Sequence, residues 1–497
     1  MDMDDPLDLF PIRAGQEDVD WGAIKNACNG TLSNRGIKIL RQGLDSYAKT
    51  VVLEKKYICK DHRNLFSNYY SKRFHPELVY CNRLHFFSTE KFSLEDLIID
   101  PEQYQDRYLG YSVIRPVANQ CLGRTIIEPY KIGKGEGRSF HCLVTPFKAH
   151  FAGLEFSVNG YPHISQDTEA MVCAHAALWG VCRYLSERYT SYRELFPYDL
   201  VEMSGTQYGR RAPYRGMTYF DYSHILSQFG CYPLVMTIKG ENDNICPKAF
   251  QELYTYVESG FPVLASIGGH AIALIGHTID YEKNPTPDEN NLINSSKFLK
   301  QFVVSDDNFF PYALFGHLDD PENYGREYLL SSLQVRKGIE SVIRAVCPLP
   351  EKVFLQAPTA ENKAKKFFLL EMNSLQQVAQ GPYVLRFFLT NSTSFKARKR
   401  EIALRSFEAN DDTSDMLSSF VLGLSLPHFI WVMEISTIEA YKRGYCIGEV
   451  VLDSTASQYE NKNIYLRIGN KIWYNDTLET FGGSSTEFQQ YRHNLGE

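Results

Sequence analysis

The stretch that decides the fold of this 497-residue chain reads Gln166-Asp-Thr-Glu-Ala-Met-Val-Cys173-Ala-His-Ala-Ala-Leu-Trp179. It opens a run rich in Ala, Leu and Trp that predicts a helix over 169–189. Cys173 then lies near the start of the helix, where unpaired N–H groups and the helix dipole favour a thiolate. The thiolate is the nucleophilic form of cysteine, so the stretch predicts a nucleophile at Cys173. Because a cysteine in an Ala-rich helix is more often a small buried hydrophobe, the prediction depends on a partner base elsewhere.

The best candidate for that base is His270. It stands between two apolar segments that predict strands over 262–267 and 271–275, in the sequence Gly260-Phe-Pro-Val-Leu-Ala-Ser-Ile-Gly-Gly-His270-Ala-Ile-Ala-Leu-Ile-Gly276. The two glycines before the histidine predict a tight turn. A rigid strand end is a good place to hold a general base, so we expect His270 to pair with the thiol.

Two further groups complete the predicted site. A third residue should orient the imidazole, and the predicted strand 302–305 runs directly into Asp306-Asp307-Asn308. Asp306 is the first choice, with Asp307 and Asn308 as alternatives. Gln166 lies in the loop that precedes the helix, where its amide could help to bind an oxyanion beside the sulfur.

The order of these motifs resembles that of the papain-like cysteine peptidases, most nearly the leader-peptide peptidase domains of bacteriocin exporters. The motifs that carry the resemblance, over about 160–315, are Gln166-Asp167, Cys173-Ala-His-Ala-Ala-Leu, Gly260-Phe-Pro-Val, Gly269-His270 and Val304-Ser305-Asp306. The resemblance implies an α+β fold in which a helix carrying the Cys packs on an antiparallel sheet carrying the His and Asp. It also implies hydrolysis of a peptide or isopeptide bond through a thioester acyl-enzyme, with no metal or other cofactor. The implied catalytic residues are Cys173, His270, Asp306 and Gln166, the last acting with the Cys173 backbone N–H as oxyanion donor.

Two departures from the family pattern leave alternatives open. The family's Gln usually precedes its Cys by six residues, whereas Gln166 precedes Cys173 by seven, and Ala174 stands where Gly or Trp is common. A binding or scaffold protein on a degenerate peptidase fold is therefore one alternative. A transglutaminase-like acyl transferase, which keeps the triad and changes the acceptor, is another.

Breaker residues and polar loops suggest four regions. We expect a poorly structured leader over 1–30, an N-terminal α+β region over 31–150, the papain-like core over 151–350 and a C-terminal α+β domain over 351–497. Large additions on both sides of a core suggest that they dock a chosen protein or peptide substrate.

Three other residues near these motifs have simpler interpretations. His175 is two residues beyond Cys173 and points to a different side of the helix, so we interpret it as structural. Cys182 is expected in the core. His277 lies seven residues after His270, so its side chain points to the opposite face of a strand, and it is a weaker alternative base.

The N-terminal region offers a rival, metal-binding arrangement. Zinc prefers four nitrogen or sulfur ligands, and the candidates here are Cys59, His62, Cys81 and His85. We do not favour zinc, because such spacings arise by chance and the second pair lies in a buried, strand-like segment. A buried network or ligand pocket is the other interpretation, formed by Glu54, Tyr57, Arg83 and His85.

The composition excludes several classes of protein. Hydrophobic residues make up 44% and charged residues 22%, which is typical of a globular protein and too apolar for general disorder. A net charge of −7 makes a nucleic-acid partner improbable, and no apolar run is long enough for a membrane helix. Eleven scattered cysteines and an acidic start without a signal peptide predict reduced thiols in the cytoplasm.

Overall fold

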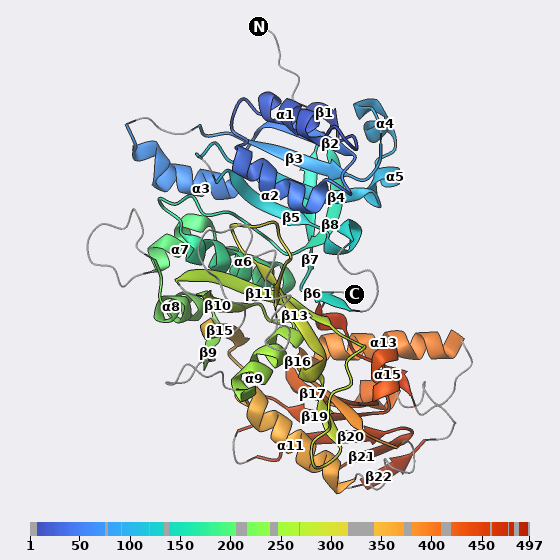
Figure 1. Cartoon of the computed structure of the whole chain (residues 1–497). Helices are drawn as coiled ribbons and strands as arrows, with labels where there is room; N and C mark the ends of the chain where they lie inside the picture. Colours follow the sequence, from blue (N-terminus) through green and yellow to red (C-terminus); the bar gives the residue numbers. More distant parts are fainter. Residues whose placement is uncertain are drawn as a thin grey trace. The chain divides into compact units, whose positions relative to one another are not determined.

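The computed structural model is an α+β structure in which most strand pairs are antiparallel, as the sequence predicts (Figure 1). It describes residues 7–74, 78–90, 92–118, 120–133, 139–204, 216–238, 247–267, 269–316, 342–371, 380–408, 419–457, 460–475, 477–481 and 487–495. The chain divides into two compact units. Unit 1 comprises Met1–Thr237, Pro262–Gly276 and Phe302–Pro348, and unit 2 comprises Ile238–Phe261, His277–Gln301 and Leu349–Glu497. This division differs from the predicted domains, because two segments of the region 151–350 cluster with the C-terminal part of the chain.

The first sheet of unit 1 has five antiparallel strands in sequence order. They are β1 (Leu7–Pro11), β2 (Thr50–Tyr57), β3 (Cys81–Phe87), β4 (Tyr108–Ile114) and β5 (Leu122–Ile127). The helices of this region are α1 (Glu17–Ala27), α2 (Asn34–Leu44), α3 (Lys60–Asn68), α4 (Leu94–Ile99) and α5 (Glu102–Gln105), with the short helices η1 (Tyr70–Lys72) and η2 (Pro129–Ile132). A hairpin of β7 (Thr145–Phe151) and β8 (Leu154–Gly160) buries alternate side chains, and Phe147 and Phe156 join a core cluster with Phe87 of the sheet.

The prediction of a poorly structured leader over 1–30 is wrong for residues 7–30. Leu7–Pro11 pairs with β2 as an edge strand, and the N–H group of Trp21 in α1 donates to Asp45 at 2.8 Å. Arg13 is bound to the carboxylate of Asp20, which orders the turn between strand and helix. A strand of five residues is too short to show clear periodicity, which explains the error.

The second sheet of unit 1 carries the candidate site. Its strand order is β14-β13-β11-β10-β15-β9, and β6 pairs with β11. The strands are β6 (Phe140–Cys142), β9 (Cys231–Thr237), β10 (Val263–Ile267), β11 (His270–Ile279), β13 (Leu299–Ser305), β14 (Ala313–Gly316) and β15 (Val342–Pro350). The helices are α6 (Cys173–Arg188), α7 (Pro197–Met203) and α8 (Tyr219–Phe229). Helix α6 contacts β10 and β7 and is buried continuously from Ala174 to Leu185, so it is a core helix.

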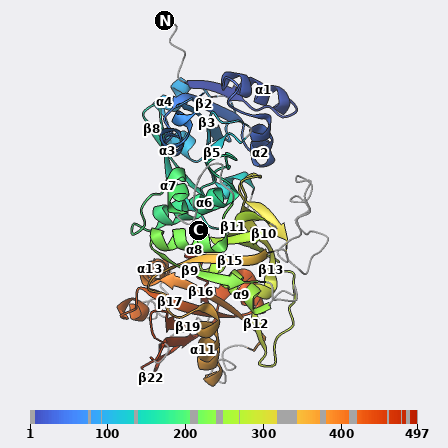
Figure 2. The ribbon, with the colours of Figure 1, turned by 90° about the vertical axis from the view of Figure 1, so that its left-hand side faces the viewer.

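Unit 2 is built around a seven-stranded sheet. Its strands in order are β12 (Leu292–Asn294), β16 (Tyr383–Asn391), β17 (Phe429–Thr437), β19 (Gly448–Asp453), β20 (Asn463–Ile468), β21 (Lys471–Tyr474) and β22 (Thr477–Thr480), with only β12 pairing in parallel. Its helices are α9 (Pro247–Glu258), α11 (Ala357–Leu370), α13 (Ser392–Glu408) and α15 (Ile438–Arg443), with η3 (Ser295–Phe298), η5 (His493–Leu495) and the strand pair β18 (Tyr445–Cys446) and β23 (Phe488–Gln489). Figures 1 and 2 place α9 and α11 on one side of these strands and α13 on the other.

A buried charge network joins three elements inside unit 2. The guanidinium of Arg386 on β16 binds Glu258 of α9 and also lies 2.7 Å from Glu434 of β17. All three side chains are buried, so each charge depends on the others.

Within the described part of the chain, no helix combines the length and the hydropathy needed to cross a membrane.

Candidate active site

Cys173 is the first residue of α6 and is half-buried. The preceding Val172 has extended backbone, and its N–H group donates to Nδ1 of His175 at 3.2 Å. Burial lowers the pKa of His175 to about 3, so the ring is a neutral acceptor that caps the helix. This is the structural role predicted for His175. Because the first N–H groups of a helix have no intrahelical partner, the thiol stands among backbone donors.

Asp167 shapes the loop that leads into α6. One carboxylate oxygen accepts the N–H groups of Glu169 at 2.9 Å and Met171 at 2.7 Å, and the other accepts the hydroxyl of Tyr70 at 2.8 Å. This closed turn keeps the residues before Val172 out of the helix. The helix therefore begins at Cys173 and not at 169 as predicted, which places the thiol in the first turn.

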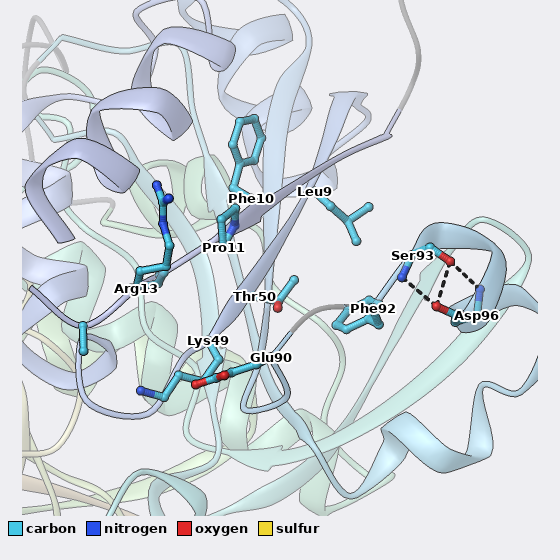
Figure 3. Close-up of a pocket in the computed structure, with 12 residues that line it drawn as sticks. Leu9, Phe10, Pro11, Arg13, Lys49, Thr50, Glu90, Phe92, Ser93 and Asp96 are labelled. Atoms are coloured by element: carbon cyan, nitrogen blue, oxygen red, sulfur yellow. Dashed lines mark hydrogen bonds between the residues drawn. The ribbon is translucent and has the colours of Figure 1, made fainter. Parts of the chain in front are cut away.

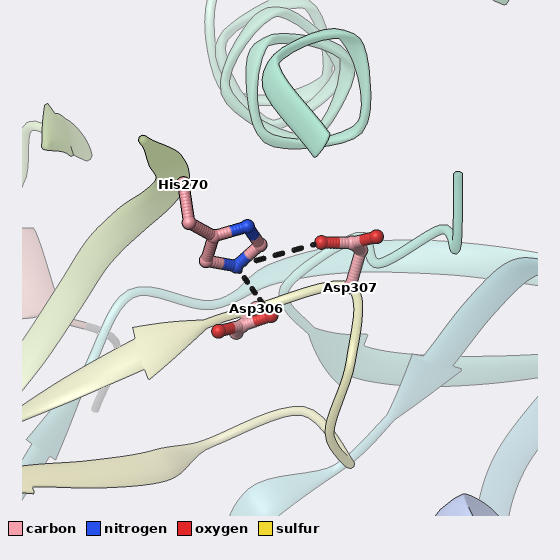
Figure 4. A group of neighbouring side chains, drawn as sticks. All are labelled: His270, Asp306 and Asp307. Atoms are coloured by element: carbon pink, nitrogen blue, oxygen red, sulfur yellow. Dashed lines mark ion pairs between the residues drawn. The ribbon is translucent and has the colours of Figure 1, made fainter. Parts of the chain in front are cut away.

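His270 begins β11, and its ring lies between the thiol and two carboxylates. Its Nε2 is 2.9 Å from Oδ1 of Asp306 and 3.7 Å from Oδ1 of Asp307. Figure 4 shows the other ring nitrogen on the side of the ring that faces away from Asp306. The thiol of Cys173 lies close enough to the ring to raise the pKa of His270, and we assign this contact to Nδ1 because Nε2 faces Asp306. The imidazole thus lies between the thiol of Cys173 and the carboxylate of Asp306.

The charge state of this cluster follows from its burial and its neighbours. Burial alone lowers the pKa of His270, but the charge and hydrogen bond of Asp306 and the contact with Cys173 raise it to about 10. Burial and the charge of Asp306 raise the pKa of Asp307 to about 7. At neutral pH the imidazole is therefore protonated, and an imidazolium beside a thiol is the arrangement that generates a thiolate nucleophile.

The three candidates for the orienting residue all lie near Nε2 of His270, and Asp306 is the nearest. The amide nitrogen of Asn308 is 3.3 Å from Nε2 and donates to Oδ1 of Asp306 at 3.1 Å. The backbone N–H of Asn308 donates to the same oxygen at 2.8 Å. Asp306 therefore has the geometry of the orienting carboxylate, with Asn308 holding it in place.

His270, Asp306 and Asp307 are also the only described group of three or more His, Cys, Asp or Glu side chains close enough to share a metal ion. The centre of that group holds a donor, however. The amide nitrogen of Asn308 lies 3.1 Å from Asp306, 3.3 Å from His270 and 3.5 Å from Asp307. A hydrogen-bond donor at this position competes with a cation, so we interpret the cluster as a hydrogen-bonded acid network.

Gln166 lies on a segment that is bonded to the same acid loop. It is half-buried, and its backbone N–H bonds to the carboxyl group of Asp307. The hydroxyl of Ser165 donates to the carbonyl of Asp307 at 3.3 Å. The segment before the cysteine loop therefore runs beside the acids, and the role of Gln166 as an oxyanion donor stays a prediction.

Two further residues singled out in the sequence, Cys182 and His277, have other surroundings. Cys182 is buried, and burial raises its pKa well above the ordinary value, so it has the core role expected. His277 is buried in unit 2, where its Nε2 binds Glu258. The structure thus brings Cys173, His270 and Asp306 together and leaves His277 outside that cluster.

The N-terminal cysteines and histidines do not form a metal-binding group. His62 is bound to the carbonyl of Leu78 at 2.8 Å and His85 to the hydroxyl of Tyr108 at 2.9 Å, and the described residues hold no second cluster of metal-ligand atoms. The alternative, a buried network, is what the structure contains: Arg83 donates to Glu54 at 2.8 Å and covers the ring of Tyr57 at 4.0 Å.

A separate cavity of about 680 Å³ lies beside β1 (Figure 3). It is lined by Leu9, Phe10, Pro11, Ile12, Arg13, Ala14, Lys49, Thr50, Glu90, Phe92, Ser93 and Asp96. Two of its polar groups already have partners, since Arg13 binds Asp20 and the carboxylate of Asp96 accepts the hydroxyl of Ser93. Its walls contain neither His nor Cys, so it offers no base or thiol of the kind that the Cys173 site provides.

Comparison of the chain with protein-family models, with curated proteins and with solved structures finds no match. The functional conclusion is therefore argued from the chemistry of the cluster.

Proposed function

We propose that the chain is a cysteine peptidase with a papain-like core, which hydrolyses a peptide or isopeptide bond in a protein substrate. The observation that carries the proposal is the position of His270, whose ring interacts with the thiol of Cys173 and lies 2.9 Å from Asp306. Helix α6, which carries the thiol, contacts β10 of the sheet whose strands β11 and β13 present the base and the acid.

The reaction begins from a thiolate and an imidazolium. The sulfur of Cys173 attacks the substrate carbonyl and forms a tetrahedral oxyanion, and the protonated His270 then gives its proton to the leaving amine. The acyl group is now a thioester, and the neutral imidazole takes a proton from water, which attacks the thioester carbonyl. That proton returns to the sulfur or stays on His270, and the carboxylic acid product leaves. Asp306 holds the ring and stabilises its charge throughout.

The oxyanion would be bound by donors next to the sulfur. The backbone N–H of Cys173 belongs to the first turn of α6, where such groups lack intrahelical partners. We assign the second donor to the amide of Gln166, which lies on the segment bonded to Asp307.

The substrate and the compartment are also part of the proposal. Ten cysteines are described as free thiols, whereas Cys246 lies outside the described residues, and this pattern supports a reducing compartment such as the cytoplasm. We propose that the regions outside the core select a protein or peptide substrate by docking it.

Site-resolved alkylation tests the proposal. The folded protein is treated with a low concentration of iodoacetamide from pH 5 to 9, and modified cysteines are mapped by mass spectrometry. Cys173 should react first, already at mildly acidic pH, and His270→Ala should abolish that advantage. His150→Ala, which removes a histidine whose side chain is 64% exposed, is the matched control and should change nothing.

Two outcomes would point to the alternatives. A Cys173 no faster than the buried cysteines would favour a binding protein on a degenerate fold. A reactive Cys173 whose acylated form is released faster by added primary amines, with amide products, would favour acyl transfer.

A further inference from the structure

Helix α2 holds the acid loop of the site at two points. Arg35, in its first turn, donates from Nη2 to Oδ1 of Asn308 at 2.6 Å. Gln42, near its last turn, accepts the backbone N–H of Phe310 at 3.1 Å. Gly43 packs so closely on the ring of Phe310 that an added Cβ would lie 2.1 Å from it. Helix α2 belongs to unit 1, like the loop it holds.

The contact of Arg35 decides which way the Asn308 amide faces. An amide presents an acceptor on one side and a donor on the other, whereas a guanidinium only donates. Because Arg35 faces the oxygen, the NH₂ group must face Asp306 at 3.1 Å and Asp307 at 3.5 Å. The reverse orientation would place an amide oxygen against two carboxylates.

We infer that Arg35 is a positioning residue for the reaction, which acts through Asn308 to fix the carboxylates that hold His270. The inference rests on the proposed function and adds to it a residue from the N-terminal region. Arg35 is itself solvent-exposed, so it acts at the edge of a buried network.

Removing the positive charge of Arg35 should have a measurable effect on the pKa of Asp307. The groups that set the pKa of Asp307 are its own burial and Asp306, which raise it, and His270, the N–H of Gln166 and Arg35, which lower it. Without the guanidinium, Asp307 should take up its proton at higher pH. Near pH 7 the negative charge beside the imidazolium then falls, whereas at the higher pH where His270 itself titrates Asp307 is ionised with or without Arg35.

The test compares full-length variants by two readouts. One is the alkylation rate of Cys173 against pH, and the other is the ¹⁵N NMR signal of the His270 ring, in which a step near pH 7 reports the ionisation of Asp307 3.7 Å away. Arg35→Gln should slow alkylation at pH 7 by about threefold to tenfold and move the Asp307 step to higher pH. Arg35→Lys keeps a positively charged group that can only donate hydrogen bonds, so it should restore at least half of the lost alkylation rate. Lys38→Gln removes an exposed cation from the same helix and should match the wild type.

A double-mutant cycle separates positioning from simple destabilisation. If Arg35 acts through Asn308, the effects of Arg35→Gln and Asn308→Ala should be less than additive. Unchanged rates and titration in Arg35→Gln, or full additivity, would overturn the inference. If the wild-type Cys173 shows no preferential alkylation, the proposed function fails, whereas the Asp307 step in the His270 signal still reports separately on Arg35.

Discussion

Replacing Asp306 by Asn should remove the imidazolium of His270 at neutral pH. The pKa of His270 is raised from 6.5 to about 10, and the charge of Asp306 is the leading cause that raises it. At 1.36 kcal/mol per pKa unit, this difference corresponds to about 5 kcal/mol of preference for the charged ring. Asn keeps the shape of the side chain and loses the charge, so burial is then opposed only by Cys173 and Asp307, and the pKa should fall well below 10, towards its ordinary value.

The assay is ¹⁵N NMR of histidine-labelled protein from pH 5 to 11, with the His270 signal assigned by its loss in His270→Gln. The alkylation rate of Cys173 at pH 6 should fall at least tenfold, since a tenfold loss needs only about 1.4 kcal/mol of that preference. Asp307→Asn is the matched control and should have a smaller effect, because Asp307 is 3.7 Å from Nε2 and Asp306 is 2.9 Å away. A His270 midpoint that stays near 10 in Asp306→Asn would refute the assignment of Asp306 as the counter-charge.

Three further predictions concern stability. The folded-state pKa of His270 lies above its unfolded value, so its stabilising contribution is complete below pH 6.5 and is lost as pH rises through about 10. The free energies of unfolding in urea of the wild type and His270→Gln should therefore converge across that window. Tyr70→Phe removes a hydrogen-bond donor from the buried carboxylate of Asp167, so it should lower the free energy of unfolding by about 1–2 kcal/mol and slow alkylation of Cys173. The control is Tyr69→Phe, which loses a half-buried hydrogen bond to Glu169 and should leave the alkylation rate unchanged. Arg386→Met leaves Glu258 and Glu434 buried without their shared cation and should cost about 3–5 kcal/mol in chemical denaturation; a loss below about 1 kcal/mol would mean that the network is not coupled.

The strands of the second sheet could be predicted because their burial makes them continuously apolar. The predicted 262–267, 271–275 and 302–305 correspond to Val263–Ile267, His270–Ile279 and Leu299–Ser305. Continuous apolar runs bounded by glycines identify such strands without knowledge of their neighbours. The order in which the strands pair, with β15 between β10 and β9, depends on contacts far apart in the sequence and could not be predicted.

The candidate site was predictable where its residues follow directly from strand and helix ends, as at His270 and Asp306. The start of α6 was not, because it depends on the side chain of Asp167 binding two nearby backbone N–H groups and on Tyr70 binding the same carboxylate. An Asp that bonds backbone N–H groups two residues on is a recognisable local turn signal. The hydroxyl of Tyr70 is a partner 97 residues away, for which the sequence carries no local signal.

The N-terminal region has a closer relation to the site than its position in the sequence suggests. Residues of 31–150 hold both loops that present reactive groups: Arg35 reaches the acid loop through Asn308, and Tyr70 reaches the nucleophile loop through Asp167. Both contacts join segments that the sequence analysis assigns to separate regions. A region that only docked substrate would have no need to bond to these loops. The geometry therefore gives α2 and η1 of the N-terminal region a positioning role at the proposed site, in addition to the docking role proposed for that region.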